Sequence, residues 1–200
     1  MNSAKRTIPQ RPNRRTYALR RGRVSIPGAR YFITLVTADR QTGLTSEAIA
    51  NSLLDTCRAQ HRNGDYQLWM ATVMSDHLHL LVTLGEPLEL SQVIAKFKSS
   101  GPLRSQGPGL RWQQNFYDHR VRHESALEPF ARYTFLNPYL AKLLNCRETW
   151  PWSVQNRHYQ PEFRKLLKDG QYPQPEWISD GESIQDIIEA DCLRDPEGPT

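Results

Sequence analysis

The segment from residue 66 to residue 84 limits the fold more than any other part of the chain. It contains two apolar runs, 66–74 and 77–84, with only Ser75 and Asp76 between them. Runs of this length and composition are typical of β-strands, and so short a connection joins strands that are antiparallel neighbours. We therefore expect a β-hairpin around which the other elements are arranged.

Two histidines lie at the start of the second strand. His77 and His79 are two residues apart, so their side chains project from the same face of the strand. An imidazole buried among apolar neighbours such as Leu80 and Leu81 must find a polar partner or lose hydration energy. One shared metal ion would satisfy both rings. The alternative is one buried histidine bonded to the backbone and one exposed histidine at the strand end.

The hydrophobic periodicity of the rest predicts a single α+β domain. Besides the hairpin, strands are predicted at 30–38 and 112–122, and helices at 45–61, 88–99 and 125–136, with a further turn or two at 139–145. Asn137 and Pro138 are expected to interrupt the third helix. The order of these elements favours a ferredoxin-like, mainly antiparallel sheet with helices packed on one face.

Charge divides the chain into three parts. Residues 1–30 hold nine Lys or Arg and no acid, whereas residues 176–200 hold eight acids and one base. We expect a basic flexible arm at 1–25, a folded domain at 26–160, and a C-terminal extension with an acidic tail at 161–200. The arm suits a polyanion such as nucleic acid, although a solvated arm that aids solubility has the same composition.

Cysteine content and hydropathy indicate the compartment. The three cysteines are an odd number at wide spacings, which fits neither a zinc ribbon nor a disulfide framework. A reducing cytoplasm is therefore expected. The chain has no apolar run of about 18 residues and no apolar segment after its basic start, so neither membrane insertion nor secretion is predicted.

A tyrosine and an asparagine on the third predicted helix suggest chemistry. Tyr133 and Asn137 are four residues apart and share one helix face, which can meet the two histidines. Two imidazoles and an amide oxygen would hold a divalent ion with open positions, and Tyr133 would be a nucleophile. A tyrosine pKa of about 10 requires help from a metal, a base or positive charge, for which Arg132 and His119 are candidates. The alternative for Tyr133 is a core aromatic residue.

Several ordered blocks of the sequence resemble the REP-associated tyrosine transposases, bacterial single-tyrosine relatives of the HUH nucleases. The blocks are HLH at 77–79, RWQQNFYDHRVR at 111–122, RYTFLNP at 132–138 and WPWS at 150–153. The similarity extends from residue 31 to residue 153, which is most of the predicted domain.

This resemblance implies a function and a site. It implies that His77 and His79 hold Mg²⁺ or Mn²⁺, with Asn137 as a third metal ligand and Tyr133 as the nucleophile. It further implies cleavage of single-stranded DNA beside a REP-type hairpin through a covalent 5′-phosphotyrosine, followed by strand transfer. A monomer in the bacterial cytoplasm, associated with the nucleoid, is expected.

Alternatives remain at the level of residues and of function. Tyr117 competes with Tyr133 for the nucleophile, and Asp118 and His119 are predicted to orient substrate or to support the site. A hairpin-binding protein without cleavage activity is the main alternative, and a phosphoesterase that uses a histidine-activated water is a third.

DNA contacts and the acidic tail complete the predictions. The residues expected to contact DNA are basic: Arg14, Arg15, Arg20, Arg21, Arg23, Lys96, Lys98, Arg120 and Arg122. Apolar residues among the acids of 180–191 favour a short amphipathic helix that would lie over the DNA groove and inhibit the protein, or else a disordered tail.

Overall fold

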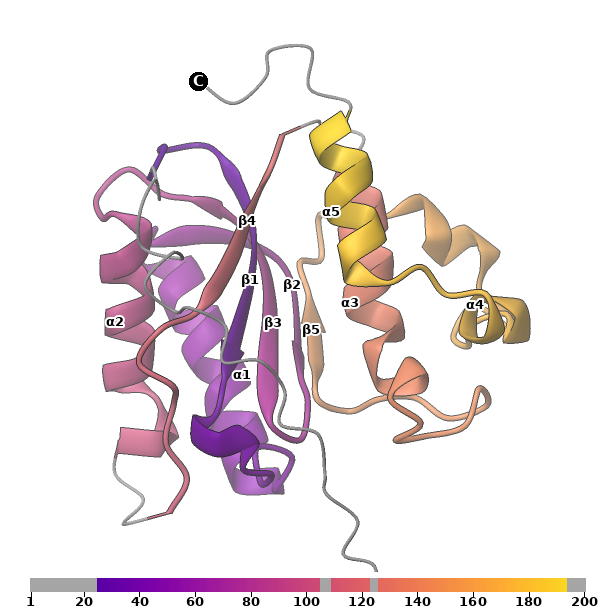
Figure 1. The fold of residues 1–200 in the computed structure, drawn as a ribbon, viewed down its shortest axis with the longest axis horizontal. Helices are drawn as coiled ribbons and strands as arrows, with labels where there is room; N and C mark the ends of the chain where they lie inside the picture. Colours follow the sequence, from indigo (N-terminus) through magenta and orange to yellow (C-terminus); the bar gives the residue numbers. More distant parts are fainter. Residues whose placement is uncertain (1–24, 105–108, 123–125, 194–200) are drawn as a thin grey trace, which may run out of the picture.

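The computed structural model describes residues 25–104, 109–122 and 126–193. Five antiparallel strands form one sheet in the order β4-β1-β3-β2-β5 (Figure 1). The strands are β1 (Arg30–Val36), β2 (Tyr66–Val73), β3 (His77–Leu84), β4 (Tyr117–Val121) and β5 (Ser153–Gln155). The helices are α1 (Glu47–Arg62), α2 (Leu90–Ser100), α3 (Leu127–Leu140), α4 (Pro175–Ser179) and α5 (Ile184–Leu193).

The first six elements follow the ferredoxin-like order. They run β1-α1-β2-β3-α2-β4, and the first four strands lie in the order β4-β1-β3-β2. The α+β class and the antiparallel sheet are therefore confirmed. The hairpin of β2 and β3 supplies the centre of the sheet, and its connection contains Ser75 and Asp76 as the sequence predicts.

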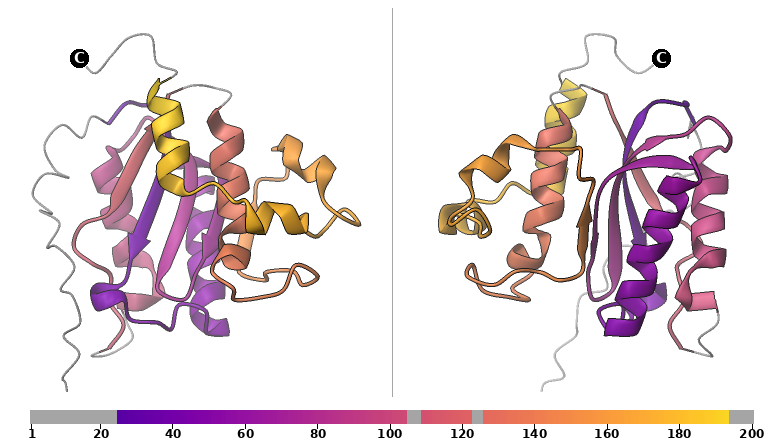
Figure 2. Two further views of the ribbon diagram at one scale, coloured as in Figure 1. Left: turned by 45° about the vertical axis from the view of Figure 1, so that its right-hand side comes forward. Right: turned by 180° about the vertical axis from the view of Figure 1, so that it is seen from behind.

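Helices cover both faces of the sheet, whereas the sequence predicts them on one. Helices α1 and α2 cover the first face, where Leu53 and Phe97 pack against Ile33 in one apolar cluster. Helices α3 and α5 cover the second face, where Phe130 packs against Phe32 in another (Figure 2). The physical reason is that the central strands are apolar on both sides, so each side must be covered.

Helix α3 continues through Pro138, although the sequence predicts an interruption there. Proline fits helical backbone angles and removes only one main-chain donor, and this helix ends two residues later at Leu140. The bonds from Ala141 to the Asn137 carbonyl and from Leu143 to the Pro138 carbonyl close its end. The continuation keeps Asn137 on the same rigid helix as Tyr133.

The C-terminal extension packs against the rest of the fold. Just before the extension, strand β5 adds a short edge to β2, and Phe163 of the extension is buried in the cluster of the second face. Ile187 and Ile188 of α5 are buried in the same cluster. A helix is therefore present within the acidic segment, as one of the two predicted alternatives requires.

Two further features bear on earlier expectations and on stability. All three cysteines carry free thiols, and within the described ranges no helix is long and apolar enough to cross a bilayer.

Gly85 follows β3 where another backbone segment comes very close, since a Cβ atom there would lie 2.0 Å from the Gly64 carbonyl oxygen. Only glycine fits that position without movement of the main chain.

Candidate active site

The two histidines face one another on the second face of the sheet. The Nε2 atoms of His77 and His79 are 3.1 Å apart, and the rings are nearly perpendicular, at 76°. His79 is buried, with 4% of its surface exposed, whereas the side chain of His77 remains 18% exposed. We call these two residues the histidine pair.

Each ring is oriented by a partner on its other nitrogen. His77 Nδ1 lies 2.6 Å from Asp76 Oδ1, and His79 Nδ1 lies 3.0 Å from Thr34 Oγ1. A carboxylate accepts the Nδ1 proton of His77, which leaves the lone pair on Nε2. Burial raises the pKa of Asp76, but the hydrogen bonds and charges of His77 and Arg40 outweigh it and lower that pKa. Asp76 is therefore a carboxylate.

The electrostatics keep His79 neutral. Burial, followed by repulsion from His77 when that ring is protonated, holds the pKa of His79 well below its usual range. A neutral imidazole offers a lone pair, which is the form that binds a metal ion. The histidine pair therefore presents two nitrogen donors that converge on one point.

The donor set fits a divalent cation with a third, neutral ligand. Within the part of the chain that the structure describes, no cluster of three His, Cys, Asp or Glu side chains could hold a metal ion. Asn137 is buried on α3, the helix that covers the histidine pair, and its amide oxygen belongs to a ligand class that such ions accept. Two imidazoles suit Mn²⁺ better than Mg²⁺, which prefers oxygen ligands.

Tyr133 lies beside the histidine pair. Its ring centroid is 5.6 Å from that of His79 and 6.0 Å from that of Phe32. Burial raises the pKa of Tyr133, and a hydrogen bond with Asn137 acts in the opposite direction. Tyr133 and Asn137 both lie on α3, one helical turn apart, as the sequence predicts.

A polar row of side chains crosses the whole sheet at this level. The strand register aligns Tyr117, Thr34, His79, Thr72 and Ser153, one from each strand. Directly opposed residues of antiparallel strands share a face, so all five side chains lie on the side of α3. Thr72 and Ser153 are joined by a hydrogen bond of 2.9 Å. Tyr117 therefore shares the face of the histidine pair, but β1 lies between it and His79.

The other two predicted site residues, Asp118 and His119, lie on opposite faces of the sheet. Asp118 is paired with Ile33 and lies on the opposite face, so the structure does not bring it to the histidine pair. His119 lies on the correct face, but its Nε2 is 2.7 Å from Asp191 Oδ2 of α5 and its ring stacks on Phe130. His119 therefore connects β4 to the C-terminal helix.

The predicted DNA-binding residues lie in different parts of the chain. Lys96 pairs with Asp65, and Lys98 donates to the backbone carbonyls of residues 113–115; both lie on α2, which covers the far face. Arg120 and Arg122 line an open pocket of about 410 Å³ together with Arg30, at the shared end of β1 and β4. The predicted arginines at 14, 15, 20, 21 and 23 lie outside the described residues.

Sequence reasoning missed the residues that support the site. Asp76 precedes His77 directly, and a carboxylate beside a candidate ligand is a signal that could have identified it. Thr34 comes from a distant segment, and only the pairing of β1 with β3 reveals its contact with His79.

A comparison with protein families identifies the family of this chain. The family model described as "Transposase IS200 like" matches residues 25–128, which include the histidine pair and end before Tyr133. A comparison with curated proteins gave no match.

One of two similar solved structures shows the same fold. A REP-associated tyrosine transposase bound to a REP hairpin is 22% identical, with a TM-score of 0.60, over 81% of this chain and 96% of that one. A transposase described as putative, from Deinococcus radiodurans, is 20% identical, with a TM-score of 0.38, over 62% of this chain and 96% of that one.

Proposed function

Because the chain belongs to the IS200-like transposase family, we propose that it is a metal-dependent endonuclease and strand transferase for single-stranded DNA. Its nucleophile is Tyr133, and its substrate is DNA beside a REP-type hairpin. The observation that carries this proposal is the position of Tyr133, whose ring centroid lies 5.6 Å from that of His79, on the helix that also carries the buried Asn137. The family match ends before Tyr133. The assignment of this tyrosine as the nucleophile is therefore based on its position in the structure and on the resemblance of the sequence block that contains it.

Each residue of the site has its own role in the proposed cleavage. The Tyr133 oxygen attacks the phosphorus atom, the bond to the 3′ oxygen breaks, and that oxygen leaves with a proton as a 3′-OH. The product is a 5′-phosphotyrosine, which the 3′-OH of another strand attacks in the reverse step. Burial opposes ionisation of Tyr133 and raises its pKa overall, whereas the neighbouring Asn137 side chain acts in the opposite direction and does not outweigh it. A divalent ion held by the histidine pair and Asn137 would polarise a phosphate oxygen.

Substrate binding rests on basic residues near the same sheet. Arg30, Arg120 and Arg122 line one pocket, and guanidinium groups form paired hydrogen bonds with phosphate. We assign the DNA hairpin to this end of β1 and β4, where Ile26 also lines the pocket. A solved structure with the same fold is bound to a REP hairpin, which supports hairpin DNA as the class of substrate.

We propose that the enzyme works as a monomer, because the residues assigned to its site come from one chain. The histidine pair on β3 and Tyr133 on α3 meet within the same fold, without a contribution from a second copy. We place its activity in the bacterial cytoplasm beside the nucleoid, where its substrate would be.

The test compares wild type with Tyr133→Phe and Tyr117→Phe on labelled hairpin DNA with a single-stranded flank. Each protein is incubated with Mn²⁺ or Mg²⁺ and analysed by denaturing electrophoresis. We expect a metal-dependent covalent protein–DNA band with wild type and Tyr117→Phe, and none with Tyr133→Phe.

Other outcomes assign other functions. A band that is lost only in Tyr117→Phe would identify Tyr117, on β4, as the nucleophile. Cleavage that persists without a covalent band in Tyr133→Phe would indicate hydrolysis by water, as in a phosphoesterase. Binding of the hairpin with no cleavage by any form would leave a recognition protein.

A further inference from the structure

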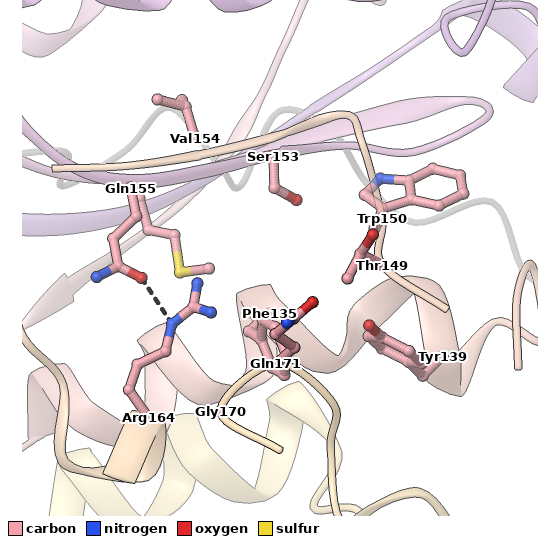
Figure 3. Close-up of a pocket in the computed structure, with 11 residues that line it drawn as sticks. Phe135, Tyr139, Thr149, Trp150, Ser153, Val154, Gln155, Arg164, Gly170 and Gln171 are labelled. Carbon is pink, nitrogen blue, oxygen red and sulfur yellow. Dashed lines mark hydrogen bonds between the residues drawn. The ribbon is translucent and has the colours of Figure 1, made fainter. Parts of the chain in front are cut away.

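A second polar pocket lies on the same face of the sheet as the histidine pair. It has a volume of about 220 Å³ and lies between β5, the C-terminal half of α3 and the segment 164–171 (Figure 3). Its lining residues are Met70, Phe135, Tyr139, Thr149, Trp150, Ser153, Val154, Gln155, Arg164, Gly170 and Gln171. The proposed cleavage chemistry uses none of them.

Arg164 supplies the charge of this pocket. Its Nε donates to Gln155 Oε1 at 2.9 Å, and its guanidinium lies over the rings of Phe135 and Phe163, at 4.8 and 5.6 Å. These contacts fix the plane of the group and direct it between β5 and α3, as Figure 3 shows. Burial lowers the pKa of Arg164, which means that its charge is partly desolvated.

The positive charge has no acidic partner in the described structure. The ion pairs of the described residues do not include Arg164. A partly desolvated cation is costly unless an anion is bound beside it. The planar, fixed guanidinium matches the oxygen atoms of a phosphate, and hydroxyl groups of Thr149 and Ser153 line the same space.

The position of the pocket connects it to the histidine pair. Ser153 is the last member of the polar row, and its hydroxyl contacts Thr72, which is paired with His79. Two strand spacings separate Ser153 from His79, about 10 Å. The pocket wall is also fixed near the hairpin of β2 and β3, because Trp150 Nε1 donates to the Val73 carbonyl at 3.0 Å.

We propose that the Arg164 pocket binds one backbone phosphate of the single-stranded DNA that flanks the hairpin. This inference rests on the proposed function and adds a second anchor for the strand, on the β5 side of the histidine pair. Such an anchor would fix the register in which the scissile phosphate reaches Tyr133.

The experiment measures binding of hairpin DNA to the full chain without divalent metal, so that cleavage does not interfere. Each phosphate of the single-stranded flank is replaced in turn by a neutral methylphosphonate, and affinity is followed by fluorescence anisotropy. With wild type we expect one position to weaken binding by roughly tenfold to a hundredfold, the range for a charge-assisted hydrogen bond. In Arg164→Gln that position should lose its effect.

Two further variants make the result specific. Lys165→Gln is the matched control, because Lys165 is exposed and paired with Glu162 outside the pocket. Gln171→Glu places a carboxylate in the pocket and keeps Arg164, so it should remove the same sensitivity even if Arg164→Gln does not fold. A methylphosphonate profile that stays the same in Arg164→Gln and Gln171→Glu as in wild type would overturn the proposal.

A separate measurement distinguishes this inference from the proposed function. If the chain binds no hairpin DNA, the proposed function fails. Thermal stabilisation by inorganic phosphate then tests whether the Arg164 pocket binds phosphate. Stabilisation of wild type and Lys165→Gln, but not of Arg164→Gln or Gln171→Glu, would support a phosphate site. Equal stabilisation of all four forms, or stabilisation of none, would contradict it.

Discussion

Replacing Asp191 with alanine should release helix α5 from the rest of the fold. The side chain of Asp191 is 1% exposed, and its Oδ2 accepts from His119 Nε2 at 2.7 Å and from the Arg122 backbone N–H at 3.1 Å. Removing one member of a buried pair costs about 3–5 kcal/mol, because the other polar groups stay buried without a partner. A typical domain has only about 5–15 kcal/mol of stability in total.

The loss should appear first as local opening of α5. Besides Asp191, only Ile187 and Ile188 of this helix are buried, so the helix has few other contacts to hold it. We expect its amides to exchange with solvent much faster in Asp191→Ala, while the amides of β1 and β3 change little. Hydrogen exchange followed by mass spectrometry measures both regions in one sample.

A double-mutant cycle gives the magnitude for the pair itself. Urea unfolding of wild type, His119→Ala, Asp191→Ala and the double variant should yield a coupling free energy of about 1.5–3 kcal/mol. A coupling below about 0.5 kcal/mol, the range found for independent sites, would refute the reasoning.

Release of α5 should also change access to the nucleophile. Tyr133 lines a small pocket together with Gly181, Glu182 and Ile187, so the segment that leads into α5 lies against it. If that segment restricts the substrate, Asp191→Ala should cleave hairpin DNA faster than wild type. A variant truncated before Pro175 with unchanged affinity and cleavage would show that the acidic tail does not inhibit the enzyme.

Three further predictions test other parts of the structure. Thr34→Val removes the hydrogen bond that orients the buried ring of the histidine pair, so calorimetry should show Mn²⁺ binding weakened by roughly 10–100-fold. Burial raises the pKa of Cys57 to about 12, so near pH 8 a thiol reagent should modify the other two cysteines and reach Cys57 only after unfolding. Gly85→Ala forces a contact with the Gly64 carbonyl and should cost about 1–3 kcal/mol in thermal unfolding, whereas Gly109→Ala should be nearly neutral.

The sequence predicts the central elements well because their signals are local. The hairpin of β2 and β3, the helix α1 and the position of β1 follow from β-branched runs, helical spacing and a short connection. The histidine pair is predicted for the same reason, since alternation along a strand alone decides that both rings share a face. The 3.1 Å contact between His77 and His79 agrees with that prediction.

The parts that depend on distant contacts were not predictable in the same way. The predicted strand at 112–122 forms only at Tyr117–Val121, because only that part pairs with β1, while Trp112 makes an isolated bridge to Thr37. The position of α3 on the second face depends on apolar residues from four strands and from the extension, which no local period reports. The role of Asp191 depends on a contact across 72 residues.

The short strand β5 also affects how the chain can be handled. It has three residues, and it pairs with the outer edge of β2, a strand of eight residues with a largely buried sequence. An unpaired, long and apolar edge is a template for association with other chains. A fragment that ends before residue 153 would leave this edge of β2 unpaired. Aggregation of such a fragment would therefore indicate an exposed strand edge, even if the central sheet had formed.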